Sequence, residues 1–133
     1  MSTINYHIKI GDKDYEIPVE VEEQKNDKII LNGDDFLRAQ WELGKNIIRK
    51  TKDSAQLTPD VFNFLIEISG FTNTEVSQYI CVEPASVSQW RRKKGISSTA
   101  WQTFRLFFLD LFTNGHVTNE IFLSNQSERK NAA

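Results

Sequence analysis

The first 22 residues alternate between apolar and polar side chains with a period of two, which is typical of β-strands. The apolar members are Ile4, Tyr6, Ile8 and Ile10, followed after a break by Tyr15, Ile17, Val19 and Val21. Residues 11–14 (GDKD) interrupt the alternation with turn-forming residues. The pattern predicts an antiparallel hairpin with one apolar and one charged face, and a further short strand is expected over residues 28–31. Pro18 lacks an N–H, so the second strand should be an edge at that point.

Apolar residues take on helical spacing after residue 32. Residues 32–35 (NGDD) are typical of a helix start with acids in its first turn. The predicted helix ends near residues 50–52, and one apolar stripe runs along it: Phe36, Leu37, Trp41, Leu43, Ile47 and Ile48. Because an isolated hairpin is only marginally stable in water, we expect this stripe to cover the apolar face of the hairpin.

Residues 57–115 carry the signals of four short helices. The first begins at residues 58–60 (TPD), which supply a cap, a first-turn proline and an acid, and it stops at Gly70. Further helices are predicted over residues 73–80 and 84–93, and from Ser97 or Ser98 onward. Short helices with such tight connections form a compact bundle.

The order of these elements predicts an α+β fold, in which a β-hairpin plus helix unit is followed by an all-α helix-turn-helix bundle. The polar residues 51–56 suggest a linker, so we expect one unit over residues 1–52 and a second over residues 57–115. The remaining residues, 116–133, are expected to form a C-terminal segment with a frayed, polar tail.

Composition narrows the class of protein. The chain has 133 residues, of which 39% are hydrophobic and 26% charged, as in ordinary globular proteins. No apolar run approaches the roughly 18 to 20 residues that cross a bilayer, and the N-terminus lacks the features of a signal peptide. We therefore expect a cytoplasmic protein without a membrane partner. The single cysteine, Cys81, excludes an intrachain disulfide and a Cys-based zinc site, and its apolar neighbours predict that it is buried.

Signals for catalysis are missing from the sequence. It has no Gly-rich phosphate loop, no cluster of metal ligands and no nucleophile spaced to meet a base. The two histidines, His7 and His116, are far apart in the chain. We predict that the protein is not an enzyme, and we expect no catalytic residue, no metal and no cofactor.

Charge is distributed unevenly along the chain. The formal net charge is −2, but residues 1–60 carry 12 acids and 9 bases, whereas residues 71–105 carry 2 acids and 5 bases. Four of those bases are consecutive, at residues 91–94 (RRKK). Such a run is compatible with a solvated helix end, which favours cations, or with a surface that binds phosphate.

The segment of residues 72–94 decides between these alternatives. Val76 and Ile80 would share the inward face of one helix, and Val87 and Trp90 that of the next. The connection is so short that the two helices must cross sharply. Small or hydrogen-bonding residues occupy the outward positions of the second helix: Ala85, Ser88, Gln89 and Arg92. A short polar face followed by cations suits the major groove, where side chains contact base edges and cations contact phosphates.

This segment resembles the helix-turn-helix of the phage-repressor class, the Cro/Xre-like regulators, in which a Gly-Val-Ser-x-x-x-Val-Ser-x-Trp pattern is common. The corresponding residues, 81–90, are CVEPASVSQW. The resemblance covers residues 58–113, is specific only over residues 73–94, and implies a bundle that binds double-stranded operator DNA, usually as a dimer. The residues that it implies for base contacts are Pro84, Ala85, Ser88 and Gln89. Those expected at phosphates are Thr72, Asn73, Thr74 and Arg91, Arg92, Lys93, Lys94.

Two departures from the family pattern change what is expected. Cys81 replaces a glycine that usually adopts a left-handed conformation, so the turn should be either strained or differently shaped. Pro84 and Ala85 have no side-chain hydrogen-bonding groups and would contact a thymine methyl instead.

The leading hypothesis is a sequence-specific transcriptional regulator, such as a repressor, that contacts the major groove with the helix at residues 84–93. The alternative is an antitoxin or adaptor whose helix-turn-helix is mainly a surface for binding proteins. A homodimer is expected, and residues 1–52 are favoured for dimerisation or partner binding through the edge of the first strand. The last helix and residues 116–124 are the other candidates for dimerisation.

Overall fold

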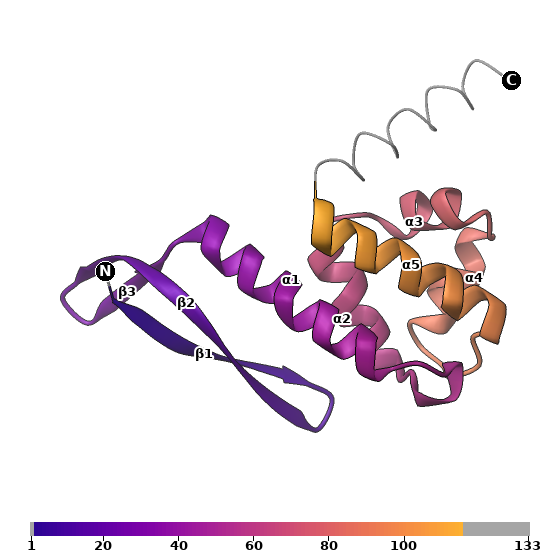
Figure 1. Ribbon diagram of the computed structural model, residues 1–133, viewed down its shortest axis with the longest axis horizontal. Helices are drawn as coiled ribbons and strands as arrows, with labels where there is room; N and C mark the ends of the chain where they lie inside the picture. The colour runs from indigo at the N-terminus through magenta and orange to yellow at the C-terminus, as the bar shows by residue number, and fades with distance from the viewer. Residues whose placement is uncertain (1, 116–133) are drawn as a thin grey trace, which may run out of the picture.

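Within residues 2–115, which the computed structural model describes, three antiparallel strands are followed by five α-helices, which makes the fold α+β (Figure 1). The strands lie in the order β1 (Thr3–Ile10), β2 (Lys13–Lys25) and β3 (Lys28–Leu31). The helices are α1 (Gly33–Lys50), α2 (Pro59–Ser69), α3 (Asn73–Ile80), α4 (Pro84–Trp90) and α5 (Ser98–Asn114), and a 3₁₀ helix, η1 (Ser54–Gln56), lies between α1 and α2. The predicted α+β fold class is confirmed.

The β1–β2 hairpin has the alternating faces that the sequence predicts. Its register pairs Ile4 with Val19 and Ile8 with Tyr15, so apolar side chains of both strands lie on one face. The connecting turn is tighter than predicted, because only Gly11 and Asp12 lie between the strands and Lys13 already pairs with Ile10. Gly11 adopts φ +64°, a conformation that glycine tolerates without steric cost and that a two-residue hairpin turn requires.

Pro18 lies where the outer side of β2 has no strand beside it. The β2–β3 pairing begins only at Val21, so β1 alone pairs with β2 at Pro18. The nearby Glu20 N–H donates to Asp35 Oδ2 of α1 at 2.7 Å, so a helix side chain takes the place of a neighbouring strand. The prediction of an edge at Pro18 is therefore confirmed, although β2 is the central strand of the sheet.

Helix α1 has two apolar sides rather than the single stripe expected. It packs against β2 on one side and against α2 and α5 on the other. Gly44 permits the close approach to α2 and α5, since a Cβ atom there would lie 2.8 Å from Ile68 Cδ1 and 2.9 Å from Phe112 Cε2. Leu37, by contrast, is 40% exposed. α1 therefore joins the sheet to the helices instead of only covering the hairpin.

One hydrophobic core extends from the sheet through α1 into the helical bundle. Its largest fully buried side chains include Trp101, Phe62, Phe104 and Phe108. The Trp101 indole N–H donates to the carbonyl of Thr51 at 2.8 Å and so fastens α5 to the end of α1. The expected units of residues 1–52 and 57–115 thus share a core, and residues 51–56 form a buried threonine and a 3₁₀ turn rather than an open linker.

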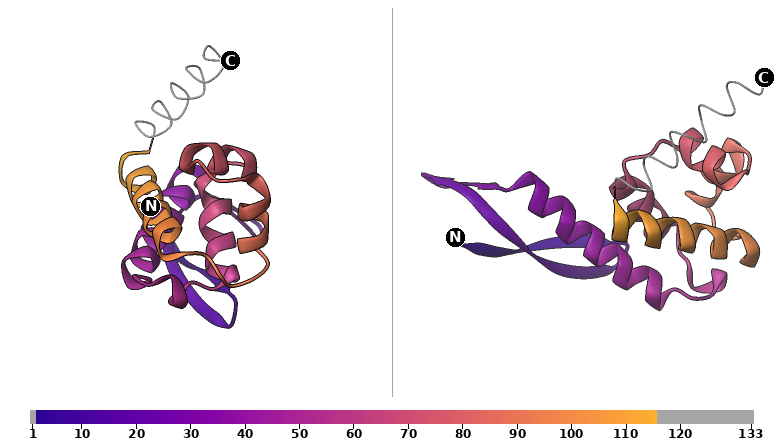
Figure 2. Two further views of the ribbon diagram at one scale, coloured as in Figure 1. Left: turned by 90° about the vertical axis from the view of Figure 1, so that its right-hand side faces the viewer. Right: turned by 45° about the horizontal axis from the view of Figure 1, so that its top comes forward.

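The sheet extends beyond the helices at one end. Figure 2 shows the end of the β2–β3 ribbon projecting away from the helical part of the molecule. None of the helices within residues 2–115 is both long and apolar enough to span a membrane. The predicted C-terminal segment, residues 116–133, lies outside the described residues.

Candidate nucleic-acid interface

Helix α3 begins and ends at the predicted residues and is closed at its start by a reciprocal cap. The Thr72 hydroxyl accepts the Glu75 N–H at 3.1 Å, and the Glu75 carboxylate accepts the Thr72 N–H at 3.0 Å. This capping box satisfies two backbone donors that would otherwise lack partners. The hydroxyl of Thr72, which we expected at a phosphate, is therefore already engaged, whereas Thr74 is exposed in the first turn.

The turn after α3 keeps a left-handed residue although it has no glycine. Cys81 adopts φ +63° and ψ +45°, and its N–H donates to the carbonyl of Ser77. The N–H of Val82 also donates to Ser77, at 3.0 Å. Of the two shapes expected for this turn, the structure has the strained one, because Cys81 retains the conformation in which glycine is preferred. Cys81 is exposed, so the prediction that it is buried was wrong: the left-handed residue at this helix end lies at the surface.

Helix α4 is shorter than predicted. It spans Pro84–Trp90 instead of residues 84–93, and the N–H of Arg92 bonds to Gln89 three residues back at 3.0 Å. Such i to i−3 bonds tighten the last turn of a helix and end it. Residues 91–94 consequently lie in a turn and a bend rather than in a helix.

The residue types expected to contact DNA lie together on one side of α4 and just after it. Ala85, Gln89, Arg92 and Lys93 line a common surface hollow of about 370 Å³, and all four are exposed. Pro84 and Lys94 are exposed as well. Ala85 and Gln89 share this side because they are one helical turn apart on α4, and Arg92 and Lys93 join them from the segment that follows the helix. Six of the eleven predicted contact residues thus lie open to solvent on α4 or just after it.

The opposite side of α4 is fixed in the core. Val87 is fully buried, and the Trp90 ring meets Phe62 and Phe104 edge to face, with centroids 6.5 and 5.8 Å away. Val76 of α3 is also fully buried, whereas Ile80 and Trp90 are only partly buried. Edge-to-face aromatic pairs of this kind add to the stabilisation from burial. α4 is therefore held by its apolar side, and its polar side is left for other contacts.

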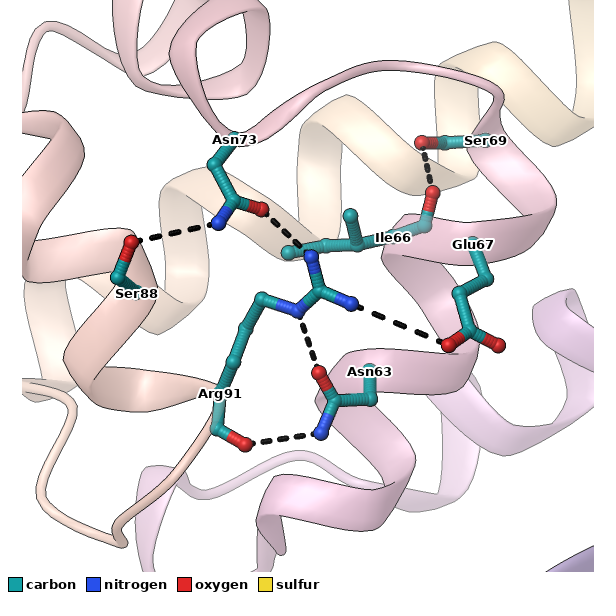
Figure 3. Close-up of polar contacts among 7 residues, drawn as sticks. All are labelled: Asn63, Ile66, Glu67, Ser69, Asn73, Ser88 and Arg91. Atoms are coloured by element: carbon teal, nitrogen blue, oxygen red, sulfur yellow. Dashed lines mark hydrogen bonds and ion pairs between the residues drawn. The ribbon is translucent and has the colours of Figure 1, made fainter.

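Arg91 differs from the three cations that follow it, because its guanidinium is turned inward (Figure 3). Its Nε donates to Asn63 Oδ1 of α2, and its Nη1 donates to Asn73 Oδ1 of α3 at 2.7 Å. Its Nη2 lies 3.9 Å from Glu67 Oε1, again on α2. We expected Arg91 at a phosphate, but these three partners belong to the protein itself.

Two more residues of the predicted interface belong to the same network. The Asn73 amide donates to Ser88 Oγ at 3.3 Å, so a predicted phosphate contact and a predicted base contact are bonded to each other. Asn63, which was not among the predicted contact residues, donates its amide N–H to the carbonyl of Arg91 at 2.8 Å. The periodicity of α4 was the available signal for Arg91, because residues 87, 90 and 91 fall on one helix face. We find no such signal in the sequence for Asn63.

Tyr79 connects α3 to the last helix. Its ring lies 4.3 Å from that of Phe107 on α5, measured between centroids. Burial raises the pKa of the Tyr79 phenol, and the negative charge of Asp110 raises this pKa further. The phenol therefore stays neutral at neutral pH, and Tyr79 contributes packing rather than charge to this side of the molecule.

Comparisons with known proteins add no family to this description. The chain matches no family model, and neither the curated proteins nor the solved structures include a significant match. Within residues 2–115 there is no group of three His, Cys, Asp or Glu side chains that could hold a metal ion.

Proposed function

We propose that the protein is a sequence-specific regulator that binds double-stranded DNA and contacts the major groove with the exposed side of α4. The observation that carries the proposal is the hollow shared by Ala85, Gln89, Arg92 and Lys93. It combines a small apolar side chain and an amide on one face of α4 with two cations from the segment that follows the helix. These are the groups that contact thymine methyls, base edges and phosphates in major-groove recognition.

In this proposal base contacts come from the start and middle of α4. Gln89 is suited to pair bidentately with adenine, and Pro84 and Ala85 are suited to thymine methyls. Ser88 is a weaker candidate, because its hydroxyl already accepts a hydrogen bond from Asn73. We therefore propose that these three side chains, from Gln89, Pro84 and Ala85, recognise A·T base pairs.

Phosphate contacts are assigned to the cations outside the Arg91 network. Arg92, Lys93 and Lys94 are exposed and follow α4 directly, and Thr74 is exposed at the start of α3. Residues 71–105 carry more bases than acids, although the chain as a whole has a net charge of −2. A local positive field of this kind attracts a phosphate backbone even when the total charge is negative.

The proposal is tested by selecting binding sites from random duplex DNA and then titrating the selected duplex with salt. Arg92→Ala/Lys93→Ala should weaken binding to all duplexes and reduce the salt slope by about 0.9 for each phosphate that the variant no longer neutralises. Lys25→Ala/Lys28→Ala removes the same charge from the projecting sheet and is the matched control. Equal slopes for the two variants would contradict the assignment of phosphate contacts to α4.

Gln89→Ala tests base contacts separately from phosphate contacts. The substitution should relax the preference at one base pair by roughly 1–3 kcal/mol, because it removes a bidentate pair with adenine. Non-specific affinity should stay close to that of the wild type, since no charge changes. Competition between the selected duplex and single-base variants measures this preference. Uniform weakening on every duplex would argue against a base contact by Gln89.

We further propose that the regulator is a homodimer that pairs through β1. The carbonyl of Ser2 accepts the Val21 N–H at 2.9 Å, which makes these two residues a hydrogen-bonded pair. Because bonded and non-bonded pairs alternate along an antiparallel ladder, the even-numbered residues of β1 bond to β2 and the odd-numbered ones direct their N–H away from it. β1 is an edge strand, and a second copy would continue the sheet. Two helix-turn-helix units on one DNA face need such a connection to hold half-sites about 34 Å apart.

His7→Pro tests the dimer, because it removes an outward N–H without removing a bond to β2. We expect this variant to sediment as a monomer and Ile8→Val to sediment as the wild type. A wild-type chain that is monomeric at all concentrations would contradict the dimer. A chain that enriches no duplex would contradict DNA binding and favour the alternative, an antitoxin or adaptor with a protein-binding surface.

A further inference from the structure

We infer that Arg91 is a positioning residue that sets the orientation of α4 against α2 and α3, and that it is not one of the phosphate-binding cations. Its relevance to recognition rests on the proposed DNA-binding function. The inference rests on the two hydrogen bonds and the ion pair in Figure 3, through which the guanidinium at the end of α4 contacts residues of both α2 and α3.

α4 needs such support because it is short. Its seven residues, Pro84–Trp90, are fewer than an isolated helix requires in water, and the N-cap residue Glu83 makes no side-chain capping bond. On the apolar side, Val87 and Trp90 hold the helix in the core. Apolar contacts have no preferred direction, so with apolar packing alone a small rotation of a short helix costs little free energy. Directional contacts are therefore needed to fix where the exposed side chains point.

Arg91 supplies these contacts at the C-terminal end of α4. The guanidinium bonds to Asn63 of α2 through Nε and to Asn73 of α3 through Nη1, and it faces Glu67 through Nη2. The planar guanidinium has five N–H donors in a fixed arrangement, so it meets several acceptors at once. Rotation of α4 about its axis would break these contacts together.

Asn63 makes the arrangement reciprocal. Its Oδ1 accepts from Arg91 Nε, and its Nδ2 donates to the carbonyl of Arg91 at 2.8 Å. The same amide thus fixes both the side chain and the backbone of Arg91. The side chain of Arg91 is only 27% exposed, whereas Arg92 and Lys93 line the open hollow. The inward contacts leave the guanidinium little access to a phosphate, and this separates Arg91 from its neighbours.

The test compares Arg91→Lys with Arg92→Lys in the full chain. Both variants keep the charge, so phosphate binding at either position predicts nearly wild-type behaviour for both. If Arg91 positions α4, lysine there should increase the hydrogen-exchange rate of the Val87–Arg91 amides by about tenfold, because a single ammonium cannot replace the contacts to two helices. Arg92→Lys should leave these rates unchanged. Equal rates in both variants would overturn the inference.

Asn63→Ala provides a second variant that leaves every charge in place. It should raise the same exchange rates, and it should have little further effect when combined with Arg91→Lys, since both act on one network. Fully additive effects would contradict the inference.

On DNA, Arg91→Lys and Asn63→Ala should weaken binding to the selected duplex with an unchanged salt slope. A reduced slope in Arg91→Ala equal to that of Arg92→Ala would assign Arg91 to a phosphate. If the wild-type chain binds no duplex, the proposed function fails, but the exchange rates still decide whether Arg91 fixes α4.

Discussion

The two ends of the β-sheet are held in different ways. At the end formed by the β1–β2 turn, Ile10 is buried and Gly11 lies against α2, where a Cβ atom would be 2.9 Å from Asp60 Oδ2. At the other end, every residue from 22 to 30 is exposed, including Ile29 and Ile30 at 47% each. One end is therefore part of the core, and the other is a ribbon in solvent.

The difference shows what determines burial in this sheet. The apolar residues of β2 end at Val21, and the four residues that follow it in the strand are polar, whereas β3 still carries Ile29 and Ile30, which are exposed. Val21 lies beside the start of α1, where Asp35 bonds to the Glu20 N–H. Beyond this point no helix within residues 2–115 backs the strands (Figure 2). Burial therefore depends on the helix beside the sheet and not on the strand pattern alone.

The largest effect on stability is expected from Trp101, on the side of the molecule away from the ribbon. Trp101→Ala should lower the free energy of unfolding by about 3–5 kcal/mol, because it leaves a cavity and deprives the Thr51 carbonyl of its donor. Urea unfolding measures this loss. Leu106→Ala on the same helix is the control, since Leu106 is 72% exposed and should change stability by less than about 0.5 kcal/mol.

A smaller, pH-dependent effect is expected at Asp35, which bonds to β2 where the buried part of the sheet gives way to the exposed ribbon. Hydrogen bonds from the Arg38 side chain and from the Glu20 N–H lower the pKa of the Asp35 carboxyl below its usual value of 3.8. The folded state therefore favours the carboxylate, and its contribution is present above pH 3.8 and is lost as the pH falls through that value toward the lowered pKa.

The Asp35→Asn variant should therefore lose less stability than the wild type as the pH falls, because it has no carboxylate to protonate at this position. The measurement is the urea midpoint of the wild type and the variant between neutral pH and about pH 3. Asp34→Asn removes the same charge one residue earlier and serves as the control. If both variants show the same dependence on pH as the wild type, the bonds at Asp35 do not stabilise the junction of α1 with the sheet.

The smallest effect is expected in the ribbon. Ile29→Thr/Ile30→Thr should change the free energy of unfolding by less than about 1 kcal/mol, because both side chains are largely exposed and threonine also favours strands. Thermal unfolding measures this change. A loss as large as that of Trp101→Ala would mean that the ribbon is covered in solution, which would remove the contrast between the two ends of the sheet.

Most elements could be predicted from the sequence because their signals are local. Gly70 ends α2 with φ +78°, and the predicted bounds of β3 and α3 agree with the structure. The second apolar side of α1 was not predicted, because Gly44 carries no hydrophobic signal although it allows the contact with Phe112. Close approach between helices depends on what lies opposite, and the sequence of one helix does not contain that information.

The residues exposed on α4 could likewise be predicted from local spacing, whereas the contacts between helices at the candidate interface could not. Ala85 and Gln89 share a side of α4 as their spacing predicts, and Arg92, just after the helix, lines the same hollow. Residues 91–94 form an uninterrupted basic run, in which only the helical spacing of Arg91 from Val87 and Trp90 marks it as different. Its partner Asn63 lies 28 residues earlier on another helix, so the network becomes visible only when the helices are packed.

The position of α1 between sheet and bundle also affects how the chain folds during synthesis. Residues of β1 to α1 emerge from the ribosome first, at about 5–20 residues per second. The side of α1 that packs on α5 stays uncovered until residues 98–114 have been made, because α5 is the last described helix. Until then the apolar surface around Gly44 is available to chaperones or to other nascent chains, and α5 is the last of the described helices to dock.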